Sequence, residues 1–252
     1  ANIVTVTGAA VVVTNNGTVT ITSTAAASLA GTGGWTQGTG STLNYAGSTL
    51  TVTTKNFSAN ANTFNYNASA AQTVFATTYS ALTISGTLTK TLGGAVVVNG
   101  NLTINSGPTL NPAGQNLTVS GSTAIIGTLG DGTVAGTTSL QNVDLSGGTI
   151  NGTATGVVNI NGTLTMPTGN GTIGRMTLTV TGTTTVASSR ILTLNSNTGV
   201  KTFIGAITIN STGTWTSTTV TTTGNLILRG GIVNNGTAFS AGGATFNTNS
   251  QA

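Results

Sequence analysis

Short apolar runs separated by glycine- and asparagine-containing breakers recur along the whole chain, most clearly over residues 63–110. There, Leu82-Thr83-Ile84 and Leu102-Thr103-Ile104 alternate apolar and hydroxyl side chains, which is the period of a strand with one buried face. Ser-Gly, Gly-Gly and Asn-Gly pairs bound these runs, and such pairs favour tight turns. The pattern therefore predicts many short strands joined by turns.

The composition supports strands and argues against helices. The 252 residues include 59 threonines and 37 glycines, whereas glutamate, histidine and cysteine are absent. Charged residues make up 3% of the chain, against about 25% in an ordinary soluble domain. Threonine favours strands, and the usual helix-forming residues are scarce, so we expect an all-β protein.

Apolar positions recur at an interval of about 20 residues, which favours a repeat fold. We predict a β-solenoid (parallel β-helix) of about twelve coils near 20 residues each, with two or three short strands per coil, forming one continuous segment over residues 1–252. At about 4.8 Å per coil, the rod would be roughly 60 Å long. The recurring positions, predicted to face inward, are Ile84, Ile104, Ile126, Ile160, Val180, Ile209 and Leu228.

Two departures from this regular scheme need to be weighed. Residues 25–41 combine an Ala-rich run with a Gly-rich run, which predicts an irregular part of the chain, such as a wider loop or a frayed coil. The alternative fold is a series of tandem β-sandwich domains. The chain has no Cys-Trp-Cys pattern and no modularity of sandwich-domain length, so the solenoid is favoured.

The same central stretch carries a family resemblance. The phrases Asn99-Gly-Asn-Leu-Thr-Ile-Asn105 and Leu117-Thr-Val-Ser-Gly121 resemble repeat units of giant secreted surface proteins of Bacteroidetes-type bacteria, in which Gly-Asn-Leu-Thr-Ile repeats occur. The resemblance is clear over about residues 63–121 and diffuse elsewhere. It implies a secreted repetitive adhesin or fibre segment without catalytic residues.

The sequence offers little for chemistry. Only Asp131 and Asp144 carry carboxylates, and their separation would not stack them in a coil of about 20 residues. We therefore expect both to be turn or loop residues, and we expect no catalytic site, no cofactor and no metal site. The six cations are scattered singly, which disfavours nucleic-acid binding. No apolar run approaches the roughly 18 residues of a membrane span.

One surface motif stands out, namely threonine pairs that flank an apolar residue. If the apolar residue faces inward, the two hydroxyls lie on the same outward strand face. Outward threonines are also ordinary on exposed strands, so the motif has a purely structural explanation as well. The residues predicted to form an outward contact face are Thr87, Thr89, Thr163, Thr165, Thr177 and Thr179.

Together these features predict a non-enzymatic extracellular structural module, part of a cell-surface adhesin or filament that provides length, rigidity and surface contact. The alternative is an ice- or carbohydrate-binding β-solenoid that uses the threonine arrays. Expected partners are further copies or neighbouring repeats end to end, and surface polysaccharide. Residues 244–252 match residues 63–72 and stop in mid-repeat, so we also expect 1–252 to be an excerpt of a longer chain or polymer.

Overall fold

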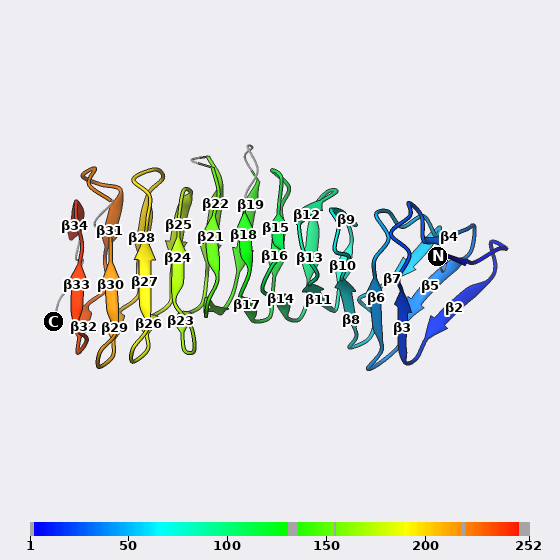
Figure 1. Ribbon diagram of the computed structural model, residues 1–252, viewed down its shortest axis with the longest axis horizontal. Helices are drawn as coiled ribbons and strands as arrows, with labels where there is room; N and C mark the ends of the chain where they lie inside the picture. Colours follow the sequence, from blue (N-terminus) through cyan, green and yellow to red (C-terminus); the bar gives the residue numbers. More distant parts are fainter. Residues whose placement is uncertain (1–2, 131–135, 154, 218–219, 247–252) are drawn as a thin grey trace.

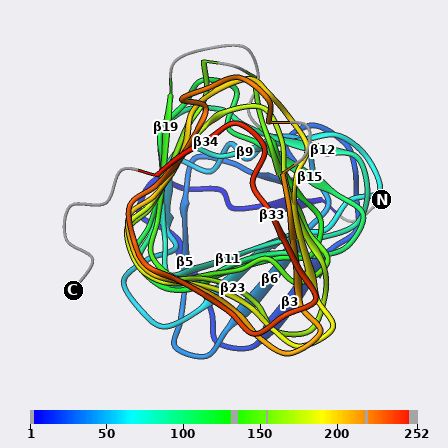
Figure 2. The ribbon, with the colours of Figure 1, turned by 90° about the vertical axis from the view of Figure 1, so that its left-hand side faces the viewer.

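The protein is a parallel β-solenoid of about eleven turns (Figure 1). The computed structural model describes residues 3–130, 136–153, 155–217 and 220–246, and these contain strands and no helix. Every strand pairing is parallel. The expected all-β solenoid is confirmed, with a coil number close to the predicted twelve. Viewed along its long axis, the stack has a roughly triangular outline with one sheet on each side (Figure 2).

Three sheets make up the walls, and each complete coil contributes one strand to each of them. The long sheet contains β3 (Thr18–Ile21), β6 (Thr42–Tyr45), β8 (Thr63–Tyr66), β11 (Ala81–Ile84), β14 (Leu102–Ile104), β17 (Thr123–Ile125), β20 (Val143–Asp144), β23 (Leu164–Met166), β26 (Thr184–Val186), β29 (Ile207–Ile209) and β32 (Ile232–Asn234). The β10 sheet contains β10 (Thr78–Tyr79), β13 (Val96–Val98), β16 (Leu117–Val119), β19 (Thr137–Leu140), β22 (Val157–Ile160), β25 (Thr177–Val180), β28 (Lys201–Phe203), β31 (Leu226–Leu228) and β34 (Ala244–Phe246). The β9 sheet contains β9 (Gln72–Val74), β12 (Thr89–Leu92), β15 (Thr109–Asn111), β18 (Thr128–Gly130), β21 (Thr149–Asn151), β24 (Gly171–Ile173), β27 (Ile191–Leu194), β30 (Thr214–Thr216) and β33 (Ala238–Ser240).

The first coils use two shorter sheets on the sides that the β10 and β9 sheets cover later. The strands are β1 (Val4–Thr5) and β4 (Leu29–Ala30) in one, and β2 (Val12–Asn15), β5 (Gly34–Gln37) and β7 (Thr54–Asn56) in the other. A single bridge between Phe57 and Tyr79 links the second of these to the β10 sheet. The long sheet runs without interruption from β3 to β32.

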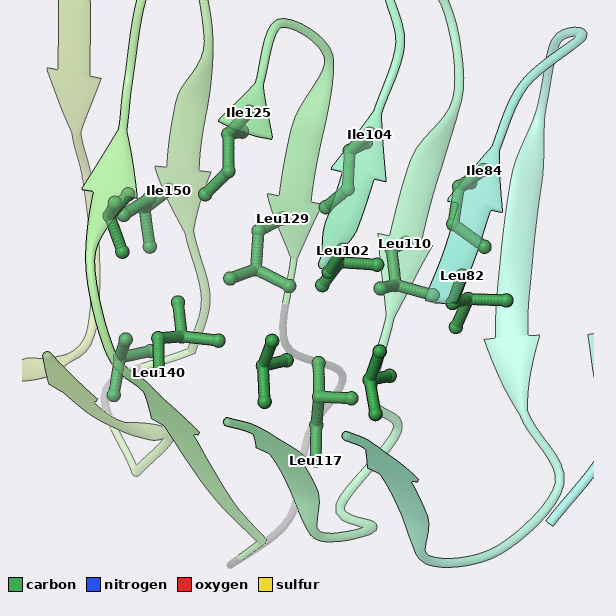
Figure 3. Close-up of a cluster of buried hydrophobic side chains, with 14 of the residues drawn as sticks. Leu82, Ile84, Leu102, Ile104, Leu110, Leu117, Ile125, Leu129, Leu140 and Ile150 are labelled. Carbon is green, nitrogen blue, oxygen red and sulfur yellow. The ribbon is translucent and has the colours of Figure 1, made fainter. Parts of the chain in front are cut away.

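Side-chain alternation builds the core. In β11, β14 and β17 the inward side chains stack in register, so that Ile84 lies beside Ile104 and Ile104 beside Ile125 (Figure 3). Of the seven positions predicted to face inward, six are fully buried, whereas Ile126 is 44% exposed. Ile126 follows the inward Ile125 and therefore points outward, so its prediction was wrong.

The six correct positions do not form one column. Ile84, Ile104 and Ile209 belong to the long sheet, whereas Ile160, Val180 and Leu228 belong to the β10 sheet.

The corners between sheets depend on close backbone approach. At Gly86 the φ angle is +74°, and a Cβ atom would lie 2.2 Å from the carbonyl oxygen of Ala68 in the preceding coil. Only glycine fits there without displacing the neighbouring chain.

Asparagine side chains bridge successive coils at other corners. The Oδ1 atoms of five asparagines accept hydrogen bonds at 2.9–3.1 Å from backbone N–H groups of the next coil. These hydrogen bonds satisfy backbone N–H groups that the hydrogen bonding between strands leaves without a partner. The residues are Asn101, Asn116, Asn142, Asn151 and Asn170.

Residues 25–41, expected to be irregular, contain the regular strands β4 and β5. Trp35 anchors β5 because its side chain is buried and its Nε1–H donates to Gln37 Oε1 at 2.9 Å. Asn15 Nδ2 donates to the same oxygen at 3.0 Å, which ties β2 to β5 across the interior. Composition alone suggested loops here because Ala and Gly surround Trp35.

The sequence similarity between residues 63–72 and 244–252 does not correspond to one structural position. The earlier copy forms β8 in the long sheet, whereas the later copy begins in β34 of the β10 sheet. Residues 247–252 lie outside the described part of the chain. The two segments share a strand-forming pattern, and this pattern recurs on more than one side of the coil.

Candidate functional site

The six threonines predicted as a contact face lie on three different sides of the rod. Thr89 begins β12 in the β9 sheet and Thr87 lies in the corner before it. Thr163 and Thr165 lie at β23 in the long sheet, and Thr177 and Thr179 lie in β25 of the β10 sheet. The motif therefore marks strands but does not by itself gather hydroxyls on one surface.

The local pattern around these residues also differs from strand to strand. In β25 the expected arrangement is present, since Leu178 is buried between outward Thr177 and Thr179. At Thr87 the motif is not a strand, because Leu88 has a φ of +60° and its side chain is 60% exposed. Thr163 precedes β23, and its hydroxyl donates to Asn142 Oδ1 at 3.1 Å.

A regular threonine column does exist, on the outer face of the β9 sheet. Seven threonines occupy register-paired positions in successive strands from β12 to β30, and a serine in β33 follows. All are half-buried and outward. The threonine column consists of Thr89, Thr109, Thr128, Thr149, Thr172, Thr193 and Thr216, with Ser240 next in line.

The sequence contained the signal for this column, because its members recur at intervals of 19 to 24 residues. It is obscured because threonine is also abundant on the other two sides and because corner loops of different length vary the interval.

Of the two aspartates, Asp144 lies in the described part of the chain, whereas Asp131 lies outside it. Asp144 was expected in a turn or loop, but it is the last residue of β20 and its side chain faces outward. Its Oδ1 atom accepts the backbone N–H of Ser146 at 3.0 Å, which shapes the turn after the strand.

Two lysines point into the core, where sequence reasoning placed only apolar side chains. Lys90 Nζ donates to the carbonyl oxygens of Ala68 at 2.7 Å, Ala70 at 2.5 Å and Thr87 at 2.9 Å. Lys201 Nζ donates to the carbonyl oxygens of Ser196, Thr198 and Gly199. Burial lowers the pKa of each lysine to about 8. Both ammonium groups are occupied in closing corner turns, so we assign them a structural role.

Three tyrosines form a second buried polar group. Tyr66 and Tyr79 share a hydrogen bond of 2.8 Å between their hydroxyls, and Tyr66 also accepts the N–H of Phe75 at 2.9 Å. The Tyr45 hydroxyl donates to the carbonyl oxygen of Thr49. Burial raises the pKa of Tyr45 to about 12 and raises the pKa values of Tyr66 and Tyr79 as well. These hydroxyls stay protonated and hold the chain in place.

The surface is hollowed on the outer face of the long sheet. One hollow of about 320 Å³ crosses β14, β17, β20 and β23, and a second of about 340 Å³ lies at the corner beside β8 and β11. Both hollows are lined by Asn101, so they adjoin each other along the rod axis. We call the two together the long-sheet groove.

Within the described residues there is no group of three or more metal-binding side chains and no helix that could cross a membrane. The geometry therefore presents a hydroxyl column on one side, an open groove with both polar and apolar lining on another, and structural lysines inside. Comparisons of the chain with protein-family models, with curated proteins and with solved structures gave no match.

Proposed function

We propose that this chain is a non-enzymatic extracellular structural module, part of a cell-surface adhesin or filament that provides length, rigidity and surface contact. The observation that carries the proposal is the uninterrupted long sheet of eleven strands, which makes one stiff axial element. At a parallel strand spacing of about 4.8 Å, the stack is roughly 50 Å long.

The outer surface also suits this role. Outward positions are mostly threonine, asparagine and serine, and the chain has eight charged side chains in all, six basic and two acidic. A surface of this kind stays hydrated without strong repulsion between copies packed side by side. In the described part of the chain, the buried titratable groups hold turns together and do not converge on an open cleft.

Contacts end to end are favoured by the strand edges of the terminal coils. Among the described residues, β2 pairs only with β5, and β32 pairs only with β29. The first coil exposes Val12 by 55% and leaves the inward Val13 36% exposed, and the last coils expose Val233 by 51%. Unpaired strand edges with apolar side chains attract further strands. We infer that further coils, from neighbouring repeats or other copies, stack head to tail on these edges.

Light scattering over a range of protein concentrations tests this proposal, with small-angle X-ray scattering to measure the particle length. We expect lengthening rods at high concentration, with a cross-section that stays constant. Val13→Lys places a charge in the open interior of the first coil and should suppress the lengthening. Thr179→Lys on the β10 sheet is the control and should not. A particle that grows sideways, or a chain that stays monomeric at all concentrations, would contradict end-to-end assembly.

A second candidate function, ice or carbohydrate binding, is favoured by the threonine column. Hydroxyl and methyl groups repeat there at the strand spacing of about 4.8 Å, which is a regular array suited to a regular surface. Inhibition of ice recrystallisation measures the first activity directly. Thr149→Lys and Thr172→Lys in the column should abolish it, whereas Thr179→Lys should leave it intact. Absence of inhibition by the unaltered protein would eliminate this ice-binding candidate.

A further inference from the structure

The long-sheet groove owes its depth to small residues at the outward positions of the sheet. In the register of β14, β17 and β20, Ala124 lies between Thr103 and Asp144, so a methyl group is flanked by two longer side chains. At the neighbouring corner, a Cβ atom on Gly100 would lie 2.7 Å from the carbonyl oxygen of Ser80. The floor at that corner is therefore backbone, and the groove is a consequence of how the coils pack.

Hydrogen-bond donors are fixed along this groove. The Oδ1 atoms of Asn101 and Asn142 accept the backbone N–H groups of Ser122 and Thr163, each at 3.0 Å. With the oxygen held by the next coil, the orientation of each amide is set, and its Nδ2 has no hydrogen-bond partner among the described residues. Both asparagines line the groove. They provide two amide donors that a ligand oxygen can accept from.

Acceptors and apolar groups lie between these donors. Asp144 uses Oδ1 for the Ser146 N–H, which leaves Oδ2 as an acceptor on the groove side of β20. Thr103 and Thr165 add hydroxyl groups in the same outward column, where Thr103 lies next to Ala124 and Thr165 next to Asp144. The Thr165 hydroxyl donates to the carbonyl oxygen of Val143 at 3.3 Å and can still accept a hydrogen bond. Alternating hydroxyl, amide and methyl groups complement a sugar ring, which has C–H faces and hydroxyl edges.

Charge and backbone pairing narrow the ligand class further. No lysine or arginine lines either hollow, and one carboxylate lies in the first, so an anionic ligand is disfavoured. An extended peptide could not add to the sheet, because β14, β17 and β20 are already paired on both edges. The hollows, of about 320 and 340 Å³, are open to solvent, so a ligand would lie along the surface of the rod.

We propose that the long-sheet groove binds a segment of a neutral polysaccharide, with the sugar chain lying along the rod axis. The inference rests on the proposed surface-contact role and assigns that contact to one side of the rod. No aromatic ring is among the residues lining the two hollows, so binding is carried by hydrogen bonds and methyl contacts. Individual sugar units are then held weakly, and affinity comes from several coils engaging one chain.

Affinity electrophoresis tests this with three neutral polymers cast in native gels: dextran, hydroxyethyl cellulose and a galactomannan. We expect at least one polymer to retard the unaltered protein. Ala124→Trp fills the groove and should reduce the retardation at least tenfold. Thr118→Trp places the same side chain on the outward face of β16 in the β10 sheet and should leave retardation unchanged. Circular dichroism of both variants checks that the solenoid is intact.

Three outcomes would overturn the proposal: no retardation by any of the three polymers, equal retardation of the Ala124→Trp and Thr118→Trp proteins, or, in a further gel cast with cationic chitosan, retardation by chitosan alone that Asp144→Asn abolishes. The last outcome would show attraction of a cation to Asp144 instead of recognition of a neutral sugar. The rod-length measurement does not depend on the groove. If the groove does not bind polysaccharide, the proposed structural role still stands, and the two proposals can fail separately.

Discussion

The N-terminal coils, residues 12–92, and the central coils, residues 96–194, share one backbone plan but differ in what fills them. The N-terminal interior holds Gln37, Gln72, Lys90 and a cluster of aromatic rings, with Phe64 and Tyr66 stacked 4.7 Å apart between ring centroids. The central interior is filled by Leu, Ile, Val and Met, and among the described residues of these coils the buried polar side chains are all threonines.

The difference shows two ways of fixing a coil. Gln72 Nε2 donates to the carbonyl oxygens of Tyr45 and Gly47, each at 2.8 Å, while its Oε1 accepts the N–H of Ala68 at 3.1 Å. Such a side chain is satisfied in one register only. The aliphatic interior instead contributes free energy through apolar burial, which is not directional. We infer that the N-terminal coils set the register and that the central coils supply most of the stability.

The largest expected effect lies in the central coils. Ile104→Ala or Ile160→Ala should lower the free energy of unfolding by about 2 to 5 kcal/mol, because each leaves a cavity among fully buried neighbours. Thr103→Ser, which alters the outward face beside Ile104, should cost well under ~1 kcal/mol. Denaturant unfolding measures both. Equal losses would mean that the inward and outward faces are wrongly assigned.

A hydroxyl deletion in the N-terminal coils should have the next largest effect. Tyr66→Phe removes the group that pairs with the Tyr79 hydroxyl and accepts the Phe75 N–H. The Tyr79 hydroxyl keeps its hydrogen bond to the carbonyl oxygen of Phe75 at 2.8 Å, but the Phe75 N–H loses its acceptor, which should cost about 1 to 3 kcal/mol. Leu164→Met in the central coils, a change of similar volume, should cost less than about 1.5 kcal/mol. If Tyr66→Phe unfolds like the unaltered protein, hydrogen bonding does not define these coils.

The pH dependence of stability separates the buried lysines from the buried tyrosines. The folded-state pKa of Lys90 and of Lys201 is about 8, below the ordinary value of 10.5, so between these two pH values the unfolded state holds more protons. The free energy of unfolding should therefore rise from pH 8 to about pH 10. Both lysines contribute over this range, so we expect a rise of a few kcal/mol.

Above pH 10 the sign reverses. The buried tyrosines have raised pKa values, so the unfolded state loses their protons first and stability falls. The double variant Lys90→Met with Lys201→Met should lose the rise and keep the fall. Thermal melts across pH 7 to 11 test this, and a rise that persists in the double variant would exclude the lysines as its cause.

The smallest expected effect on the free energy of unfolding comes from the asparagines at the corners between sheets. Asn142→Ala removes the oxygen that accepts both the N–H and the hydroxyl of Thr163, and should cost about 0.5 to 1.5 kcal/mol because this corner is solvated. Asn159→Ala alters an outward asparagine within β22 and is the matched control, with little expected effect. Similar losses in the two variants would argue against the bridging role of corner asparagines.

Sequence patterns predicted the fold class because alternation and turn residues recur in every coil. They failed where two apolar residues are adjacent: in Ala124-Ile125-Ile126 the inward residue is decided by pairing with the neighbouring coils. Lys90 and Lys201 were also missed, because a lysine in a strand usually faces solvent. Their partners are backbone carbonyls, two of them some 20 residues away from Lys90, which no local pattern shows.

The candidate surfaces were predicted less well than the fold. Threonine motifs marked single strands, but the threonine column depends on register between coils of unequal length. The long-sheet groove depends on small residues, Ala124 and Gly100, whose significance appears only once the coils are stacked.

Distances along the threonine column test the central claim that each coil adds one strand to every sheet. The chain has no cysteine, so spin labels can be placed at Thr89→Cys paired with Thr172→Cys, Thr193→Cys or Thr216→Cys. These pairs are four, five and six ladder steps apart. Electron–electron double resonance should give backbone separations that increase evenly, about 19, 24 and 29 Å. Separations that do not increase in equal steps, as tandem sandwiches would produce, would contradict the solenoid.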